Sequence, residues 1–169
     1  MLRAIATCPL VTPITNADSR IQVIDVDDVV RTVSMALKPG ATARAIWQLA
    51  HPHVHRLEDI ILAIRAWLGE PARPVWHVPR GIGHIIARCA DTLSWLGWRS
   101  PARTTAIRQL NAGVTGDPSD WIAATGMKPR GLSEILADRP ADLRDRWNAR
   151  MYLIKPLAIA VLALFWIVT

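Results

Sequence analysis

Two segments of the chain repeat their apolar residues with the period of an α-helix. In residues 57–68, LEDIILAIRAWL, apolar positions recur every three or four residues, and Gly69 follows where the pattern stops. A second run begins after Asp27 and stops at Pro39. Its apolar residues fall on one helical face, at Val29, Val30, Val33 and Leu37. The pattern predicts two helices, each with its apolar residues gathered on one face.

Short apolar runs bounded by turn residues predict strands. Such runs occupy residues 20–26, 43–50 and 74–78. Residues 4–14 are also apolar, but two prolines interrupt them, which favours an extended edge segment. The stretch TNADSR, residues 15–20, predicts a turn.

The second half of the chain has a mainly helical pattern. Helices are predicted over residues 80–96, 101–110 and 132–138 and from residue 141 onward. Between them, Asp117 is interpreted as an N-cap, Pro118 as the first helical residue and Gly126 as the end of a short helix. Few short strands among several helices indicate an α/β class, here an α+β fragment.

Three carboxylates lie where the strand pattern of residues 20–26 changes into the helical one. Asp25, Asp27 and Asp28 could form a catalytic acid cluster, a metal site or a helix N-terminus. An N-cap carboxylate accepts hydrogen bonds from free backbone N–H groups, and a second carboxylate in the first turn is favoured by the helix dipole. We therefore interpret Asp27 and Asp28 as the helix cap. Asp25 is left over and, on a strand, would face a cleft.

Composition and charge narrow the function classes. The chain has 169 residues, 51% of them hydrophobic, and a formal net charge of +6. Its basic residues are not gathered into Lys/Arg blocks, so we expect no nucleic-acid partner. Cys8 and Cys89 lie far apart in apolar surroundings and form no CxxC pair, which predicts two buried thiols.

The C-terminal segment predicts a membrane anchor. Residues 156–169, PLAIAVLALFWIVT, carry no charge, and a helix of this length reaches about 21 Å, against about 30 Å for a hydrocarbon core. Arg144, Arg146, Arg150 and Lys155 precede it. By the positive-inside rule the body, residues 1–139, lies on the cytoplasmic side of the inner membrane, and residues 140–169 lead into a single membrane segment. A buried core helix is the alternative.

Several segments resemble one family. RIQVIDVDDVV (20–30), LEDIILAIRAWLG (57–69) and the long run from LGWRS to GMKP (96–129) are similar to the C-terminal half of atypical extended short-chain dehydrogenase/reductase proteins. The subgroup is the one fused to a DoxX-like membrane domain, and DRWNARMYLIKPLAIAVLALFWIV (145–168) resembles its junction. The resemblance implies the substrate-side portion of an NAD(P)-binding, reductase-like membrane protein. Substrate-side candidates are Gln22, Asp25, Trp95 and Trp98.

The chain departs from that family in the groups that carry chemistry. RGIGHII, residues 80–86, lacks the third glycine of a dinucleotide-binding turn. Tyr152 and Lys155 are one residue too close for the Tyr-x-x-x-Lys pair, and the subgroup usually has His where Asp25 stands. We therefore expect no catalytic residue and no bound cofactor in this chain, which would be inactive alone. NAD(P) is expected as the cofactor of the intact relative. We also expect this chain to expose an apolar face, which either the missing nucleotide-binding half or self-association would cover.

Two other functions stay open. A small membrane-anchored binding or scaffold module would need no cofactor. HPHVH places His51, His53 and His55 at alternate positions, where a strand would turn all three toward one metal ion. Against a metal site, Pro52 disturbs the strand and no carboxylate or i, i+4 histidine pair supports it.

Overall fold

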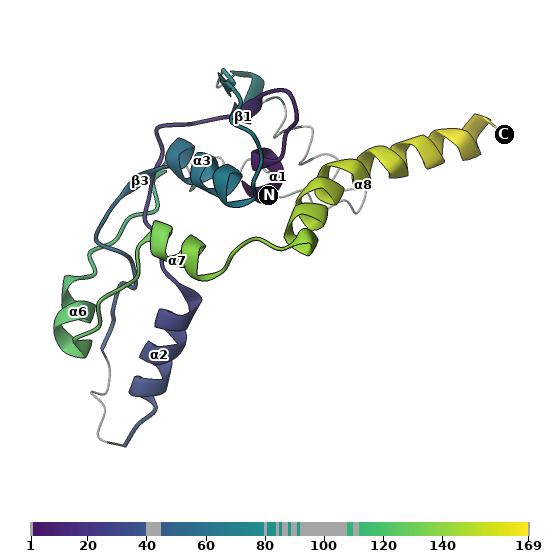
Figure 1. Ribbon diagram of the computed structural model, residues 1–169. Helices are drawn as coiled ribbons and strands as arrows, with labels where there is room; N and C mark the ends of the chain where they lie inside the picture. Colours follow the sequence, from purple (N-terminus) through teal and green to yellow (C-terminus); the bar gives the residue numbers. More distant parts are fainter. Residues whose placement is uncertain are drawn as a thin grey trace.

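The structure is a computed structural model that describes residues 2–39, 45–79, 81–83, 85, 88, 91, 108, 109 and 112–168. Its body combines helices with two small sheets, and a long C-terminal helix, α8 (Leu143–Val168), leads away from it (Figure 1). The mixed α/β class expected from the sequence is therefore correct. The predicted helices over 80–96 and 101–110, together with Cys89, Trp95 and Trp98, lie mostly or wholly outside the described residues.

The core forms where α1 (Leu2–Ala6), α3 (Leu57–Trp67) and the start of α8 pack together. Its buried residues are Ala6, Ile14, Ala17, Leu57, Ile61, Leu68 and Ala149. One cation is buried beside them: the Arg65 guanidinium donates to the backbone oxygens of Ala6 at 2.7 Å, Cys8 at 3.1 Å and Pro71 at 2.7 Å. These bonds hold the segments that precede β1 and follow α3 against one another.

A parallel pair of strands crosses this core. β1 (Thr12–Ile14) pairs with β4 (Val75–His77), in the register Thr12 to Val75 and Ile14 to His77. The predicted strand at 74–78 is confirmed. The expected extended segment at 4–14 is wrong in its first part, because residues 2–6 form α1 and only 12–14 form a strand. The predicted turn at 15–20 is correct, and Asn16 within it has a φ of 55°.

The predicted strand at 20–26 is too long. Only β2 (Arg20–Ile21) is a strand, antiparallel to β3 (His55–Arg56). After β2 the backbone forms isolated hydrogen bonds. The Gln22 N–H donates to the Val114 oxygen at 3.0 Å, and the Val23 oxygen accepts from the His51 N–H at 2.9 Å. These bonds satisfy the chain without a continuous ladder.

The predicted strand at 43–50 is not present in its described part. Residues 45–50 form neither helix nor strand, and the Ile46 side chain is 94% exposed. An apolar run was interpreted as a buried strand, but only Ala50 at its end is buried. Apolar character alone cannot separate a strand from an irregular segment here.

The later helices agree with the sequence, with small shifts. α3 ends at Trp67 with Leu68 as its C-cap, and the next residue, Gly69, has a φ of 70° that glycine adopts most easily. α6 (Ser119–Thr125) ends at Gly126, also left-handed, but its N-cap residue is Pro118 and not Asp117. The Asp117 carboxylate instead accepts from the Ser119 N–H at 3.0 Å. α7 (Leu132–Asp138) and α8 lie where helices were expected.

α2 (Val26–Ala36) forms as predicted, and its polar face is the buried one. Its buried side chains are Asp28 and Thr32, whereas an apolar stripe points to solvent. That stripe consists of Val26, Val30, Val33 and Leu37, exposed by 66%, 56%, 51% and 79%. The apolar residues therefore share one face of the helix, as the sequence predicted, and within this chain that face is exposed.

α8 is a continuous helix of 26 residues. Among the described residues, no helix combines the length and the apolar character needed to cross a membrane. The C-terminal segment is thus helical, as the sequence predicted.

Candidate functional site

The three aspartates occupy the N-terminus of α2, but the cap is not the expected one. Asp25 is the N-cap: its φ and ψ are −78° and 140°, and its Oδ1 accepts from the Asp27 N–H at 3.2 Å. Asp27 and Asp28 stand in the first turn, where the helix dipole favours carboxylates. The prediction of Asp27 and Asp28 as the cap is therefore wrong by two or three residues.

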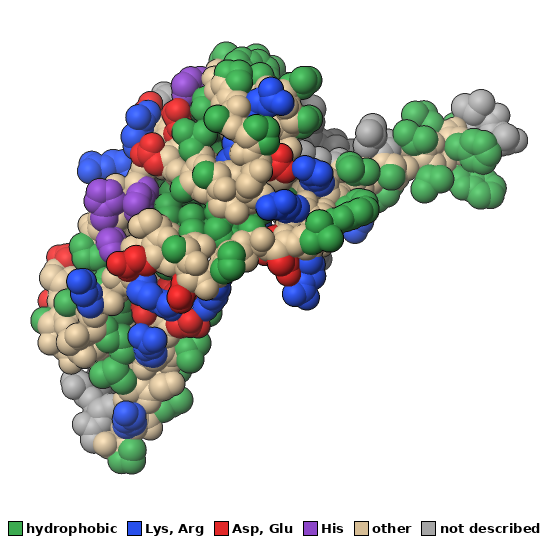
Figure 2. Space-filling view, in the orientation of Figure 1, with side chains coloured by type: hydrophobic (Ala, Val, Ile, Leu, Met, Phe, Trp, Pro, Cys, Tyr) green, Lys and Arg blue, Asp and Glu red, His purple; other side chains and the backbone are tan. Residues whose placement is uncertain are grey.

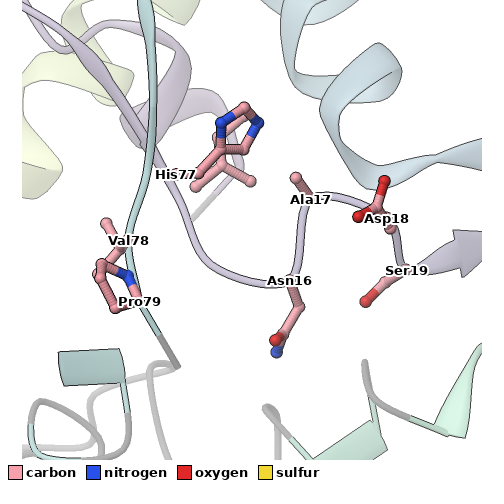
Figure 3. A pocket seen from close by; sticks show the side chains of 8 residues that line it. Asn16, Ala17, Asp18, Ser19, His77, Val78 and Pro79 are labelled. Carbon is pink, nitrogen blue, oxygen red and sulfur yellow. The ribbon is translucent and has the colours of Figure 1, made fainter. Parts of the chain in front are cut away.

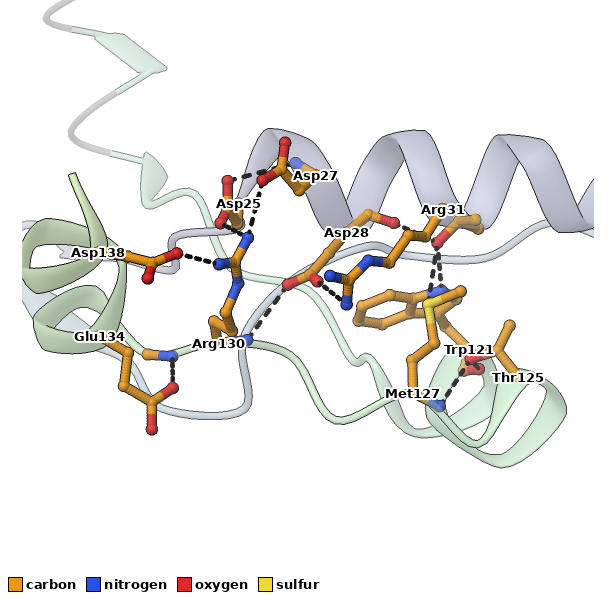
Figure 4. Close-up of polar contacts among 12 residues, drawn as sticks. Asp25, Asp27, Asp28, Arg31, Trp121, Thr125, Met127, Arg130, Glu134 and Asp138 are labelled. Atoms are coloured by element: carbon orange, nitrogen blue, oxygen red, sulfur yellow. Dashed lines mark hydrogen bonds and ion pairs between the residues drawn. The ribbon is translucent and has the colours of Figure 1, made fainter.

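Arg130 lies at the centre of these carboxylates (Figure 4). Its Nη2 forms ion pairs with Asp25 and, at 3.0 Å, with Asp27, and its Nη1 lies 2.8 Å from Asp138 of α7. Its backbone N–H donates to Asp28 Oδ2 at 3.2 Å. One arginine thus ties the start of α2 to the segment that enters α7.

Burial and pairing define the charge state of this cluster. The Asp25 and Asp28 side chains are 3% exposed. Hydrogen bonds from Arg139, at 2.6 Å, and then from Arg130 lower the pKa of Asp27 below its ordinary 3.8. The same bond to Asp27 raises the pKa of Arg130. Asp27 and Arg130 therefore stabilise each other as ions, and the ion pairs around Arg130 form an arrangement suited to holding elements together and not to transferring protons.

A second polar chain extends the cluster along α2. Trp121 is fully buried, and its indole N–H donates to Thr32 Oγ1 at 3.0 Å. The Thr32 hydroxyl in turn donates to the Asp28 backbone oxygen at 2.7 Å (Figure 4). This face of α2 is polar because α6 approaches it with an indole that needs an acceptor.

Gln22, a substrate-side candidate, serves the backbone. Its Oε1 accepts from the Gly116 N–H, and Gln48 Oε1 accepts from the Asp117 N–H at 2.9 Å. Both amides therefore hold the loop that enters α6. Asp25 is buried against Arg130, and in the described part of the chain it faces no open cleft. Trp95 and Trp98, the other candidates, lie outside the described residues.

A hollow that sequence reasoning missed lies at the carboxyl ends of β1 and β4. Its volume is about 400 Å³. In Figure 3 the chain leaves β1 through Asn16 and Ser19 on one side, and leaves β4 through His77, Val78 and Pro79 on the other. Ligand sites of parallel sheets gather at carboxyl ends, and this rule, applied to the two predicted strands, would have found these residues.

Two polar side chains in this hollow have no hydrogen-bond partner among the described residues: the Asn16 amide and the Ser19 hydroxyl. His77 is held from behind, since its Nε2 lies 3.0 Å from Glu58 Oε2. The hollow thus offers free hydrogen-bonding groups over an apolar floor of Ile14, Ala17 and Val78. It fits the general form of a small-molecule pocket.

The three neighbouring histidines do not converge. His51 Nδ1 accepts from the His53 N–H at 3.0 Å, and the His53 and His55 rings meet edge to face with centroids 4.6 Å apart. Burial lowers the pKa of His55, helped by the charges of His53 and His51. Across the described part of the chain, no three His, Cys, Asp or Glu side chains are arranged to hold a metal ion.

The far end of α8 is apolar on every side that the structure describes. Its exposed side chains are Ile159, Val161, Leu162, Leu164, Phe165, Trp166 and Ile167, each between 56% and 79% accessible. On the face that Figure 2 shows, hydrophobic side chains extend along the end of this helix, and charged side chains lie near its base. A monomer in water rarely leaves such a surface uncovered.

No protein-family model, no curated protein and no solved structure matches this chain.

Proposed function

We propose that this chain is the substrate-side part of an NAD(P)-binding, reductase-like protein, attached to a membrane by the end of α8 and without a cofactor site of its own. The hollow at the carboxyl ends of β1 and β4 carries this proposal. In open α/β sheets the ligand lies outside the carboxyl ends of the parallel strands. The free Asn16 and Ser19 side chains would contact the substrate there.

The sheet itself supports an intact protein with more strands. Among the described residues β1 and β4 pair only with each other. Parallel sheets are almost always larger and covered on both faces, and a two-stranded sheet is at best marginally stable. We propose that a nucleotide-binding domain supplies neighbouring strands and packs on the exposed stripe of α2.

The membrane attachment is supported by the uncovered apolar end of α8. Burying such side chains in lipid is worth about 25 cal/mol per Å² of apolar surface, so a handful of large residues suffices for firm attachment. The basic residues at the base of the helix favour the cytoplasmic side of the inner membrane for the body.

Vesicle flotation tests the attachment. The full chain, with neutral phosphatidylcholine vesicles, is expected to float, and Leu162→Asp/Phe165→Asp is expected to stay at the bottom. The control Val30→Asp/Val33→Asp places the same charges on another exposed apolar surface and is expected to float like the parent. A parent chain that stays at the bottom of the gradient as a stable monomer would overturn the attachment.

The Leu162→Asp/Phe165→Asp variant then tests the reductase-like part. We expect it to associate and to bind a hydrophobic dye through its uncovered faces, and to bind neither NADH nor NADPH in a fluorescence titration. Tight binding of either nucleotide would overturn the absence of a cofactor site. A compact monomer that binds no dye would favour a membrane-anchored binding module that needs no second domain.

A further inference from the structure

We propose that the basic residues around the base of the apolar end of α8 bind anionic lipid headgroups, so that the attached chain prefers a negatively charged bilayer to a neutral one. This basic collar consists of Arg146, Arg150 and Lys155. The inference rests on the proposed membrane attachment and names the lipid class that this attachment prefers.

The charge along α8 is one-sided. From residue 146 to residue 168 the sequence contains these three cations and no acidic residue. The two acids before them are engaged nearby: Asp142 pairs with Arg144 at 3.3 Å and Asp145 with Arg3 at 2.6 Å. The base of the apolar end therefore carries a local positive charge that its own helix does not neutralise.

Most of this charge is available to a ligand. Among the described residues, Arg146 and Lys155 have no carboxylate partner, and both side chains are exposed. Arg150 pairs with Glu70 at 2.8 Å but keeps 60% of its side chain accessible. Exposed pairs of this kind contribute little, so Arg150 can exchange Glu70 for a phosphate or carboxylate of lipid.

The cations surround the helix instead of marking one face. Arg146 and Arg150 are four residues apart and share a side, whereas Lys155, five residues further, lies on the opposite side. A helix that lies flat on a bilayer needs one polar and one apolar face. A collar followed by an end that is apolar all round suits a helix that enters the bilayer end-on.

The spacing matches the thickness of a headgroup layer. Arg150 and Lys155 are separated by about 7 Å along the axis, and each headgroup region is about 5–8 Å thick. Trp147 and Tyr152, 57% and 42% exposed, lie at the same level, where aromatic side chains favour the interface. With the apolar end in the hydrocarbon, the collar and these rings meet the headgroups together.

Flotation with two vesicle compositions tests the inference: phosphatidylcholine alone, and phosphatidylcholine with three parts in ten phosphatidylserine. Each basic residue near an anionic surface raises binding roughly fivefold, so the collar gives on the order of 100-fold preference at low salt. We expect the preference to fade as NaCl rises to about 0.5 M, where the screening length falls to about 4 Å.

The variant Arg146→Gln/Arg150→Gln/Lys155→Gln is expected to bind phosphatidylcholine like the parent and to lose the preference for phosphatidylserine. The control Lys38→Gln/Arg73→Gln/Lys128→Gln removes the same charge from exposed residues away from α8 and is expected to keep it. Thermal unfolding in detergent checks that both variants fold like the parent.

The possible contrary results distinguish a failure of headgroup recognition from a failure of the membrane attachment. Equal binding of the parent to both vesicles, or a collar variant that keeps its preference, would overturn the inference and leave the attachment standing. Parent binding to anionic vesicles alone, abolished in the collar variant, would keep headgroup recognition and overturn apolar insertion. No binding to either composition would overturn the attachment and the inference together.

Discussion

Helices α2 and α3 are both 11 residues long and both repeat apolar residues at helical spacing, yet they bury opposite kinds of side chain. α3 places Leu57, Ile60 and Ile61 in the core. α2 buries Asp28 and Thr32 and leaves Val26, Val30 and Val33 exposed to solvent. A helical period therefore predicts that a helix forms, while its surroundings decide which face is covered.

The cause lies in what each helix meets. α3 packs against α1 and the other apolar elements of the core. α2 is held by hydrogen bonds and ion pairs, from Trp121 to Thr32 and from Arg130 to the aspartates. The exposed stripe of α2 consists of branched apolar residues of the kind that usually pack in a core, although it is exposed here. For this reason we propose that another domain covers it.

The largest effect that tests this contrast is expected from shortening one side chain on each helix. Ile61→Ala should lower the free energy of unfolding by about 2–5 kcal/mol, because Ile61 is 1% exposed and leaves a cavity. Val33→Ala should change it by less than about 0.5 kcal/mol, because Val33 is 51% exposed. Denaturant unfolding of the full chain in detergent, followed by tryptophan fluorescence, measures both. Equal losses would mean that α2 has an apolar partner within this chain.

The next effect concerns the polar attachment of α2. Asp25→Ala should lower the free energy of unfolding by about 2–3 kcal/mol, since it removes the N-cap and a buried partner of Arg130. Asp25→Asn keeps an N-cap oxygen and should cost less. Unfolding curves of the two variants give the difference. If the two variants lose the same stability, the charge of Asp25 contributes nothing.

Which aspartate caps α2 illustrates what the sequence could not decide. Three carboxylates within four residues all suit a helix N-terminus, and the choice depends on the backbone angles of one residue, Asp25. Its partner Arg130 lies far along the chain, 103 residues from Asp27, so no local pattern announces the cluster. Periodicity and Gly69, by contrast, predicted α3 correctly because both signals are local.

The strands show the same limit. The run at 74–78 was predicted correctly because it pairs along its length with β1. The run at 20–26 was overextended because its later backbone groups bond singly to Val114 and His51, which a hydrophobic pattern cannot reveal. To predict the hollow beyond β1 and β4, one must know that these two strands are parallel neighbours. The sequence around each strand does not contain that information.

Introducing charges into the exposed stripe of α2 is expected to change stability little and to reduce association measurably. Val30→Lys/Val33→Lys should leave the unfolding midpoint nearly unchanged, because both side chains are already in water. It should reduce dye binding and self-association of the Leu162→Asp/Phe165→Asp background, as judged by light scattering. The control Leu10→Lys, at another exposed apolar residue, should not. Unchanged scattering would show that α2 is not the associating surface.

The smallest expected effect is a dependence of the free energy of unfolding on pH, which arises from His55. Burial lowers the pKa of His55 below its ordinary 6.5, and its Nε2 has no hydrogen-bond partner among the residues that the structure describes. Because the folded chain then binds the proton less readily than the unfolded chain, the free energy of unfolding falls as the pH drops below about 6.5 and levels off below the folded pKa. His55→Gln should flatten this slope between pH 7.5 and 5.5, whereas His77→Gln, at an exposed histidine, should keep it. A slope that survives His55→Gln would assign the pH dependence to another group.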